Sequence, residues 1–317
     1  MKSALVVVFL LSARFASAWG CDGHRAIAMM AEHYARPSAV AAAKALLAAQ
    51  PMTPTPSQYC GPFPSDPIVE AATWADDFRN VDRSTGSWHF VNFPLAVSDA
   101  AAHHGAYCGG DCVVDQIVRQ YGIAKTASDP AARARALRFL IHLIGDLHQP
   151  LHAIDNGDRG GNCVPVTFFA EAPTGDPNSN FTPNLHAVWD VGLVTSLMHA
   201  VGAATPAALA TKLAPDASPQ QVGAQMPTVA KVLEWAAQSN ALARSTAYGK
   251  LPNPIPPAPA LQGTMTSCDG NNHVAQRMLA LNEKLGVSYE AAARPVVRRQ
   301  LQNAAKRLAA TMDALFE

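Results

Sequence analysis

The segment from Asp129 to His152 constrains the fold more than any other part of the chain. Asp129-Pro130 is a typical helix start, because the aspartate caps the helix and the proline suits its first turn. The apolar side chains that follow recur at the spacing of one buried helix face: Leu137, Leu140, Ile141 and Ile144. Pro150 cannot continue the helix cleanly, so the chain is expected to turn there. The segment therefore predicts a buried helix over 130–147.

Helical periodicity also dominates the rest of the chain. We expect further helices over 22–34, 38–49, 67–79, 113–126, 184–200, 205–213, 219–247, 271–285 and 288–315. The non-helical segments are proline-rich loops at 51–66 and 252–259, a loop at 154–163, an extended piece at 88–93 and a short strand within 164–169. No internal repeat is visible. The prediction is an all-α fold, a single multi-helix domain over 19–317 with a few short strands.

Composition excludes several classes of protein. Of the 317 residues, 49% are apolar and only 15% are charged, which argues against a disordered or coiled-coil chain. Lys plus Arg and Asp plus Glu both number 24, so no basic excess exists to hold a polyanion by charge alone. The longest apolar run, 4–13, is too short for a membrane span of about 20 residues.

The amino terminus has the pattern of an export signal. Lys2 precedes the apolar run 4–11, and Ala16-Ser17-Ala18 matches the small-x-small cleavage rule, which places cleavage before Trp19. The alternative is a buried N-terminal helix. We expect 1–18 to be a signal peptide, and the mature protein to be periplasmic or secreted.

Six cysteines remain after that cleavage, and an even number in an oxidising compartment favours disulfides. Cys108 and Cys112 could close a small loop, whereas the other four cysteines (Cys21, Cys60, Cys163 and Cys268) allow three pairings that the sequence leaves open. A cysteine-only zinc site is disfavoured, because the chain lacks a pair of Cys-x-x-Cys knuckles.

Histidines and aspartates are spaced as metal ligands in two places. His142 and Asp146 are four residues apart and share a helix face, and the turn at Pro150 brings His152 back toward them. His186 and Asp190 repeat the same spacing. A single such pair is as often a helix surface pair without a metal. Two pairs and a returning histidine favour a metal, and zinc accepts mixed imidazole and carboxylate ligands.

Three further segments carry candidate ligands. Asp76 follows Trp74 late in a predicted helix, and His89 lies between two aromatic side chains. Cleavage before Trp19 would free an α-amine that can chelate a metal with its adjacent carbonyl, and His24 follows five residues later.

Taken together and in order, these motifs resemble the zinc-dependent S1/P1 nuclease family, which shares its fold with bacterial zinc phospholipase C. The motifs are WGxxGH, WADxxR, WHF, HxxxDxHQPLH, GDRGGN and NLHAVWD. The resemblance implies three zinc ions. It assigns one to Asp76, His89, His142 and Asp146, a second to the Trp19 amine and carbonyl, His24 and Asp146, and a third to His152, His186 and Asp190.

The resemblance also implies an activity. A secreted endonuclease would cleave single-stranded DNA and RNA to 5′-phosphate products and act on 3′-mononucleotides, with Asp76, Arg79 and Asp146 in the catalytic centre. Arg79 would clamp the phosphate, and Phe90 would stack a base. Asn92 departs from the fungal pattern, where an aspartate binds the base, so we expect a broader or different base preference. No stable protein partner is implied, and a monomer is expected.

Two alternatives remain at this stage. A zinc phospholipase C would act on lipid headgroups, but its third-zinc pair would be His-x-x-x-Glu, whereas this chain has His186 and Asp190. A non-enzymatic, exported metal-binding helical protein would keep the ligands without an open coordination position. Arg79 and Phe90 beside the ligand motifs argue against that second alternative.

Overall fold

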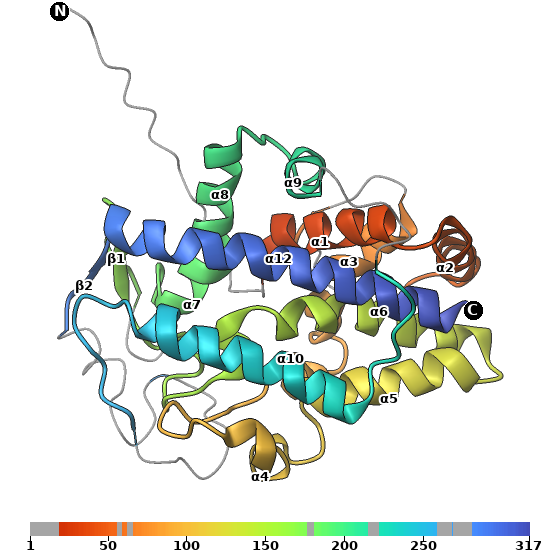
Figure 1. The fold of residues 1–317 in the computed structure, drawn as a ribbon, viewed down its shortest axis with the longest axis horizontal. Coiled ribbons are helices and arrows are strands. Elements are labelled where there is room, and N and C mark those ends of the chain that lie inside the picture. Colours follow the sequence, from red (N-terminus) through yellow and green to blue (C-terminus); the bar gives the residue numbers. More distant parts are fainter. Residues whose placement is uncertain are drawn as a thin grey trace, which may run out of the picture.

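The computed structural model describes residues 19–55, 59–61, 66–175, 181–214, 222–258, 268 and 281–317 (Figure 1). The predicted signal peptide lies outside the described residues. The α-helices are α1 (Gly20–Tyr34), α2 (Pro37–Ala49), α3 (Pro67–Phe78), α4 (Gly105–Cys108), α5 (Val113–Thr126), α6 (Pro130–Leu147), α7 (Leu185–Ala187), α8 (Leu193–Val201), α9 (Pro206–Leu213), α10 (Val229–Leu242) and α12 (Val287–Leu315).

Shorter elements connect these helices. They are the 3-10 helices η1 (Arg83–His89), η2 (Ala100–His103) and η3 (Pro150–Ala153), the π-helical segments η4 (Val188–Gly192) and η6 (Ala243–Tyr248), and the strands β1 (Val166–Phe168) and β2 (Glu283–Leu285). Helices make up most of the described chain, so the predicted all-α fold is confirmed.

Helix α6 is the centre of the helical stack. Asp129 caps it by accepting from the backbone N–H groups of Ala131 and Ala132, and every residue from Ala136 to Leu147 is buried. Helices α3, α5 and α12 all pack against α6, and α12 runs across the width of the molecule in Figure 1. The prediction of a buried helix over 130–147 is confirmed, and its polar side chains are therefore held inside the core.

The start of the described chain is fixed directly onto α6. The Trp19 indole N–H donates to the Gly145 carbonyl over 2.9 Å. A Cβ atom at Gly145 would lie 2.8 Å from Nδ1 of His24, so only glycine permits this close approach of α1 to α6. The crossing of these two helices brings His24 to the buried face of α6.

Two strands form a small parallel sheet. In its register Val166 pairs with Glu283 and Phe168 with Leu285. The strand predicted within 164–169 is thus confirmed. The helix predicted over 271–285 is wrong at its end, because the pairing with β1 makes 283–285 a strand; residues 271–280 lie outside the described residues.

Three other predicted elements differ from the structure. The extended piece predicted over 88–93 begins only at Phe90, because η1 includes His89. The helix predicted over 184–200 is interrupted by η4, and such single π-turns are frequent at functional sites. Within the described residues, the helix predicted over 219–247 begins only at Val229, where Thr228 caps it, and it changes to π geometry in η6; residues 219–221 lie outside the described residues.

The structure also decides the cysteine pairing. The predicted Cys108–Cys112 loop is present, and the pairs that the sequence left open are Cys21–Cys60 and Cys163–Cys268. Among the described helices, no single one is long and apolar enough to cross a membrane; by length and composition alone, the bent pair Leu185–Val201 and Pro206–Leu213 meets the requirement.

Candidate metal centre

The Asp146 carboxylate lies at the centre of three imidazoles. Its Oδ1 is 3.1 Å from Nε2 of His24, and its Oδ2 is 2.8 Å from Nδ1 of His89 and 3.1 Å from Nε2 of His142. All four side chains are buried. Burial alone would raise the pKa of Asp146, but the three histidines outweigh it and lower that pKa well below its ordinary value. The carboxylate is therefore ionised.

Asp76 extends this cluster from the end of α3. Its Oδ1 lies 3.6 Å from Nε2 of His142 and 3.7 Å from Nδ1 of His89. Nη2 of Arg79 contacts the same oxygen at 2.8 Å, and the Arg79 side chain is 37% exposed. Burial raises the pKa of Asp76, but Arg79 and the two histidines together lower it by more, so the pKa lies below its ordinary value. Arg79 thus lies at the solvent edge of the cluster.

The histidines of this cluster carry charge unequally. Burial lowers the pKa of His142, but Asp146 and Asp76 outweigh it and raise the value to about 9. Burial lowers the pKa of His89 to about 4 despite its contact with Asp146, and it also lowers that of His24. Without a metal, the positive charge is therefore concentrated on His142, between the two carboxylates.

A second cluster contains His152, His186 and Asp190. The Nε2 atoms of the two histidines lie 3.1 Å apart, and Nε2 of His186 is 3.3 Å from Oδ2 of Asp190. Burial, followed by the neighbouring His152, lowers the pKa of His186 to about 3, and burial raises that of Asp190 well above its ordinary value. This cluster is joined to the first because Nδ1 of His152 donates to the His89 carbonyl at 2.7 Å.

The donor atoms of both clusters fit a bound cation. Carbonyl oxygens only accept, so the Nδ1 atoms of His152 and His186, each within hydrogen-bond distance of one, carry the proton and leave Nε2 as an acceptor. Among the described residues, Nε2 of His24, Oδ1 of Asp146 and Oδ2 of Asp190 are buried and make no hydrogen bond. Within each of three groups, one ligand atom per residue lies within 4.8 Å of the others: His24/His142/Asp146, Asp76/His89/His142 and His152/His186/Asp190. Buried imidazole and carboxylate atoms that converge without partners are the ligand set that zinc accepts.

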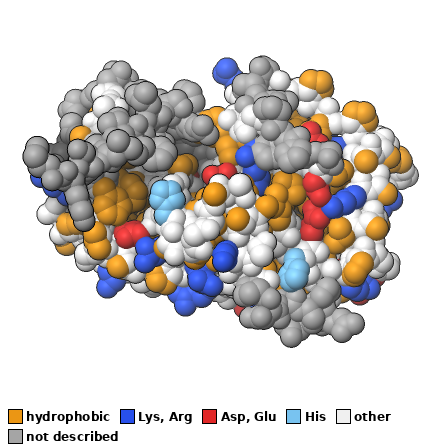
Figure 2. All heavy atoms as spheres, turned by 90° about the horizontal axis from the view of Figure 1, so that it is seen from above, with side chains coloured by type: hydrophobic (Ala, Val, Ile, Leu, Met, Phe, Trp, Pro, Cys, Tyr) orange, Lys and Arg blue, Asp and Glu red, His pale blue; other side chains and the backbone are white. Residues whose placement is uncertain are grey.

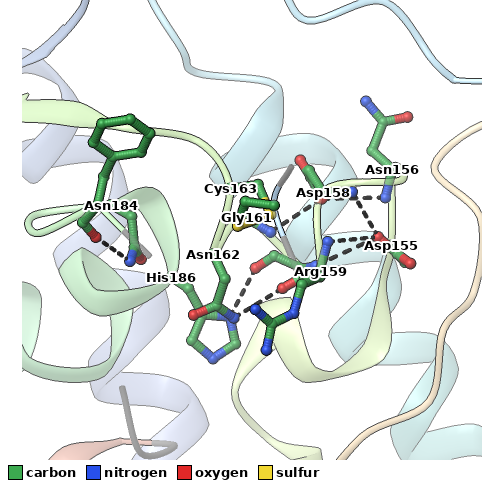
Figure 3. Close-up of a disulfide and its surroundings, with 12 residues drawn as sticks. Asp155, Asn156, Asp158, Arg159, Gly161, Asn162, Cys163, Asn184 and His186 are labelled. Atoms are coloured by element: carbon green, nitrogen blue, oxygen red, sulfur yellow. Dashed lines mark hydrogen bonds between the residues drawn. A yellow bond between two sulfur atoms is a disulfide. The ribbon is translucent and has the colours of Figure 1, made fainter. Parts of the chain in front are cut away.

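The loop before β1 holds His186 in place (Figure 3). The Gly160 carbonyl accepts from Nδ1 of His186 at 2.7 Å, and a Cβ atom at Gly160 would lie 2.5 Å from the Leu151 carbonyl oxygen. Asp158 stiffens the loop by accepting from the Gly161 backbone N–H and from the Tyr248 hydroxyl. Burial, then the neighbouring Asp155, raises the pKa of Asp158 to about 7.

The predicted base-binding residues lie on one side of an extended segment. Val91 and Phe93 are buried, whereas the alternating Phe90 and Asn92 are partly exposed. The segment is fixed beside the second cluster because the Val91 N–H donates to the His152 carbonyl at 2.8 Å. Phe90 and Asn92 therefore belong to a segment that is fixed beside the ligand His152, and their side chains are partly exposed.

Among the predicted ligands, Trp19 is the one whose proposed ligand atoms, the backbone nitrogen and carbonyl oxygen, make hydrogen bonds to other groups while residue 18 is still attached. Its backbone N–H donates to Asp190, and its carbonyl accepts from the Gly23 N–H at 3.1 Å. The side chains of the other predicted ligands all lie in the two clusters. Sequence reasoning missed the roles of Gly160 and of Gln149, which contacts Asp190, although both lie within the motifs it singled out.

Comparison with known proteins identifies relatives of this chain. The family model for S1/P1 nucleases matches residues 19–317. The chain is 27% identical to nuclease S1 of Aspergillus oryzae, over 58% of this chain and 57% of that protein. It is 29% identical to nuclease P1 of Penicillium citrinum, over 57% of this chain and 60% of that protein. These matches span less than two thirds of either relative. A match to endonuclease 2 of Arabidopsis thaliana, at 25% identity, covers 98% of this chain and 96% of that protein.

Proposed function

Because the chain belongs to the S1/P1 nuclease family, we propose that it is an exported, zinc-dependent endonuclease that hydrolyses single-stranded DNA and RNA to 5′-phosphate products. We include 3′-nucleotidase activity on mononucleotides in the proposal. The observation that carries it is the convergence of two buried histidine and aspartate clusters, joined through His89 and His152.

Three zinc ions would be held by these clusters. The first would take Asp76, His89, His142 and Asp146; the second, His24, Asp146 and the Trp19 amine and carbonyl; the third, His152, His186 and Asp190. The geometry supports this assignment because Asp146 offers Oδ1 toward His24 and Oδ2 toward His89 and His142. When bound, zinc ions activate water and neutralise charge on a phosphodiester.

The Trp19 amine belongs to this ligand set only after cleavage before Trp19. The peptide nitrogen of the uncleaved chain is not a metal ligand and donates to Asp190 instead. Export and activity are therefore linked in the proposal, because the step that removes the signal peptide also creates a ligand.

Arg79 would bind a non-bridging phosphate oxygen. Its guanidinium contacts Asp76 and is partly exposed, so it can face both the cluster and a substrate. A planar guanidinium forms strong, charge-assisted hydrogen bonds with phosphate. The Arg79 contact would orient the scissile bond and offset the charge that grows on the phosphate oxygens during attack.

Base recognition would come from Phe90 and Asn92. A stacked base needs a free face, so Phe90 favours unpaired nucleotides over duplexes. The face of the molecule in Figure 2 intersperses basic, acidic and apolar side chains, and the chain has equal numbers of basic and acidic residues. Attraction of the substrate would therefore be local to the metal centre, with little contribution from a general basic surface.

The test uses mature protein that begins at Trp19, loaded with zinc and assayed on single-stranded DNA, duplex DNA, RNA, 3′-AMP and phosphatidylcholine. We expect about three zinc ions per chain, faster cleavage of single strands than of duplex, and 5′-phosphate ends. Cleavage of the lipid alone would replace the proposal with a phospholipase C. Three zinc ions without cleavage of any phosphodiester would indicate a metal-binding protein.

A further inference from the structure

Gln149 is a fully buried glutamine that uses both ends of its side-chain amide beside the second cluster. Its Oε1 accepts from the Leu151 backbone N–H at 2.6 Å, and its Nε2 donates to Oδ1 of Asp190 at 2.7 Å. The two contacts reach different elements, because Leu151 belongs to η3 and Asp190 to η4. One side chain therefore connects η3 with η4, and its contact with Asp190 spans 41 positions of the sequence.

The oxygen end of the amide sets the position of His152. Gln149 is the cap of η3, the short helix that carries His152. The backbone carbonyl of Gln149 also accepts from the His152 backbone N–H at 2.9 Å. The Gln149 N–H in turn donates to the Asp146 carbonyl at 2.9 Å. The turn from α6 into η3 is thus built on Gln149, while Val91 and Asn240 hold the far end of η3 by donating to the His152 and Ala153 carbonyls.

The nitrogen end sets the orientation of Asp190. Because the amide N–H occupies Oδ1, the other oxygen, Oδ2, faces Nε2 of His186 and makes no hydrogen bond of its own. Asp190 lies in a π-helical segment, where regular helix geometry does not fix the side-chain direction by itself. The contact with Gln149 therefore helps to orient the carboxylate, alongside the Trp19 backbone N–H, which also donates to Asp190.

We propose that Gln149 is a positioning residue for the third metal, holding His152 and Asp190 in binding geometry at the same time. This inference rests on the proposed function, since it concerns one of the three zinc sites named there. Partners that orient metal ligands typically change metal affinity by about 10–100-fold when they are removed. The effect should be confined to the site formed by His152, His186 and Asp190.

The experiment compares Gln149→Met with wild type in zinc buffers, by counting bound zinc per chain against free zinc. Methionine keeps the length of the side chain and removes both hydrogen bonds. We expect one of the three ions to bind about 10–100-fold more weakly and the other two to bind unchanged. Gln300→Met is the matched control, because Gln300 is also a buried glutamine but donates to the His148 carbonyl and to Ser239, and touches no predicted ligand.

Asp190→Asn provides the second arm. Asp190→Asn already weakens this site. If Gln149 acts only through the same site, the double variant Asp190→Asn, Gln149→Met should bind as much zinc as Asp190→Asn alone. Gln149→Asn serves if the methionine variant does not fold, because its amide is one methylene too short to reach both partners, and the same site should weaken. Unchanged affinity in these variants, or equal weakening of all three ions, overturns the inference. Failure of the proposed function is distinct, because wild type itself would then bind too few ions or leave nucleic acid intact.

Discussion

Nε2 of His152 and Nε2 of His186 lie 3.1 Å apart, and each ring donates its Nδ1 proton to a backbone carbonyl. Both Nε2 atoms therefore direct a lone pair at the same small region. Two such acceptors repel each other unless a proton or a cation lies between them. Burial lowers the pKa of both rings, which disfavours the proton and leaves the cation as the stabilising partner.

Metal removal should therefore destabilise the fold as well as stop the reaction. A ligand that binds only the folded state at a free concentration of about 1,000 times its Kd contributes about 4 kcal/mol to the free energy of unfolding. We expect a chelator to lower the Tm in calorimetry and excess zinc to restore it. Magnesium is the control, and restoration of the Tm by magnesium would contradict a histidine-based site.

Asp146→Asn should abolish nuclease activity and lower the zinc content. The amide keeps the shape but removes the charge that lies between His24, His89 and His142. The loss should exceed the roughly 10–100-fold typical of residues that only orient ligands. Asp313→Asn is the matched control, because Asp313 is equally buried but bonds to Arg36. It should lower stability while leaving zinc content at the wild-type value.

The amino group of Trp19 can be tested by adding one residue. A protein that retains Ala18 before Trp19 has a peptide nitrogen there, and that nitrogen cannot donate a lone pair to zinc. We expect weaker binding of one zinc ion and a large loss of activity compared with protein that begins at Trp19. Equal zinc content and equal rates for the two forms would remove Trp19 from the ligand set.

Asp158 should make stability depend on pH near neutrality. Its pKa is raised from 3.8 to about 7 in the fold, so the folded state holds a proton that the unfolded state has released. Its contribution is therefore complete below about pH 4 and is lost as the pH rises toward about 7. Asp158→Asn mimics the protonated form, and its Tm relative to wild type should rise between pH 5 and pH 8. A constant difference in Tm across that range would show that Asp158 does not titrate there.

Phe90→Ala should raise KM for single-stranded oligonucleotides and change kcat little. Loss of one aromatic stacking partner typically costs about 1–3 kcal/mol per base, which corresponds to roughly 5- to 150-fold in affinity. Zinc content should not change, because the Phe90 ring is not a metal ligand. A phosphodiester substrate without a base is the control, and its KM should be the same for both proteins. An equal rise for that control would indicate a general distortion of the site.

Much of the site could be predicted because its ligands come in short local patterns. The four-residue spacing of His142 and Asp146 fixes their common helix face, and Pro150 requires the turn that returns His152. The Asp129-Pro130 cap and the apolar periodicity set the limits of α6 for the same reason, since both act within a few turns of helix. Local geometry of this kind is independent of the rest of the fold.

The remaining features depend on contacts between distant segments. The Cys163–Cys268 pairing, the parallel strand at 283–285 and the hydrogen bond from Gln149 to Asp190 each join residues that no local pattern relates. The sequence alone determined which residue types were available as ligands and on which helix faces they lie. Only the tertiary structure decided which carboxylate oxygen and which ring nitrogen face the metal centre, because those orientations follow from hydrogen bonds that packing creates.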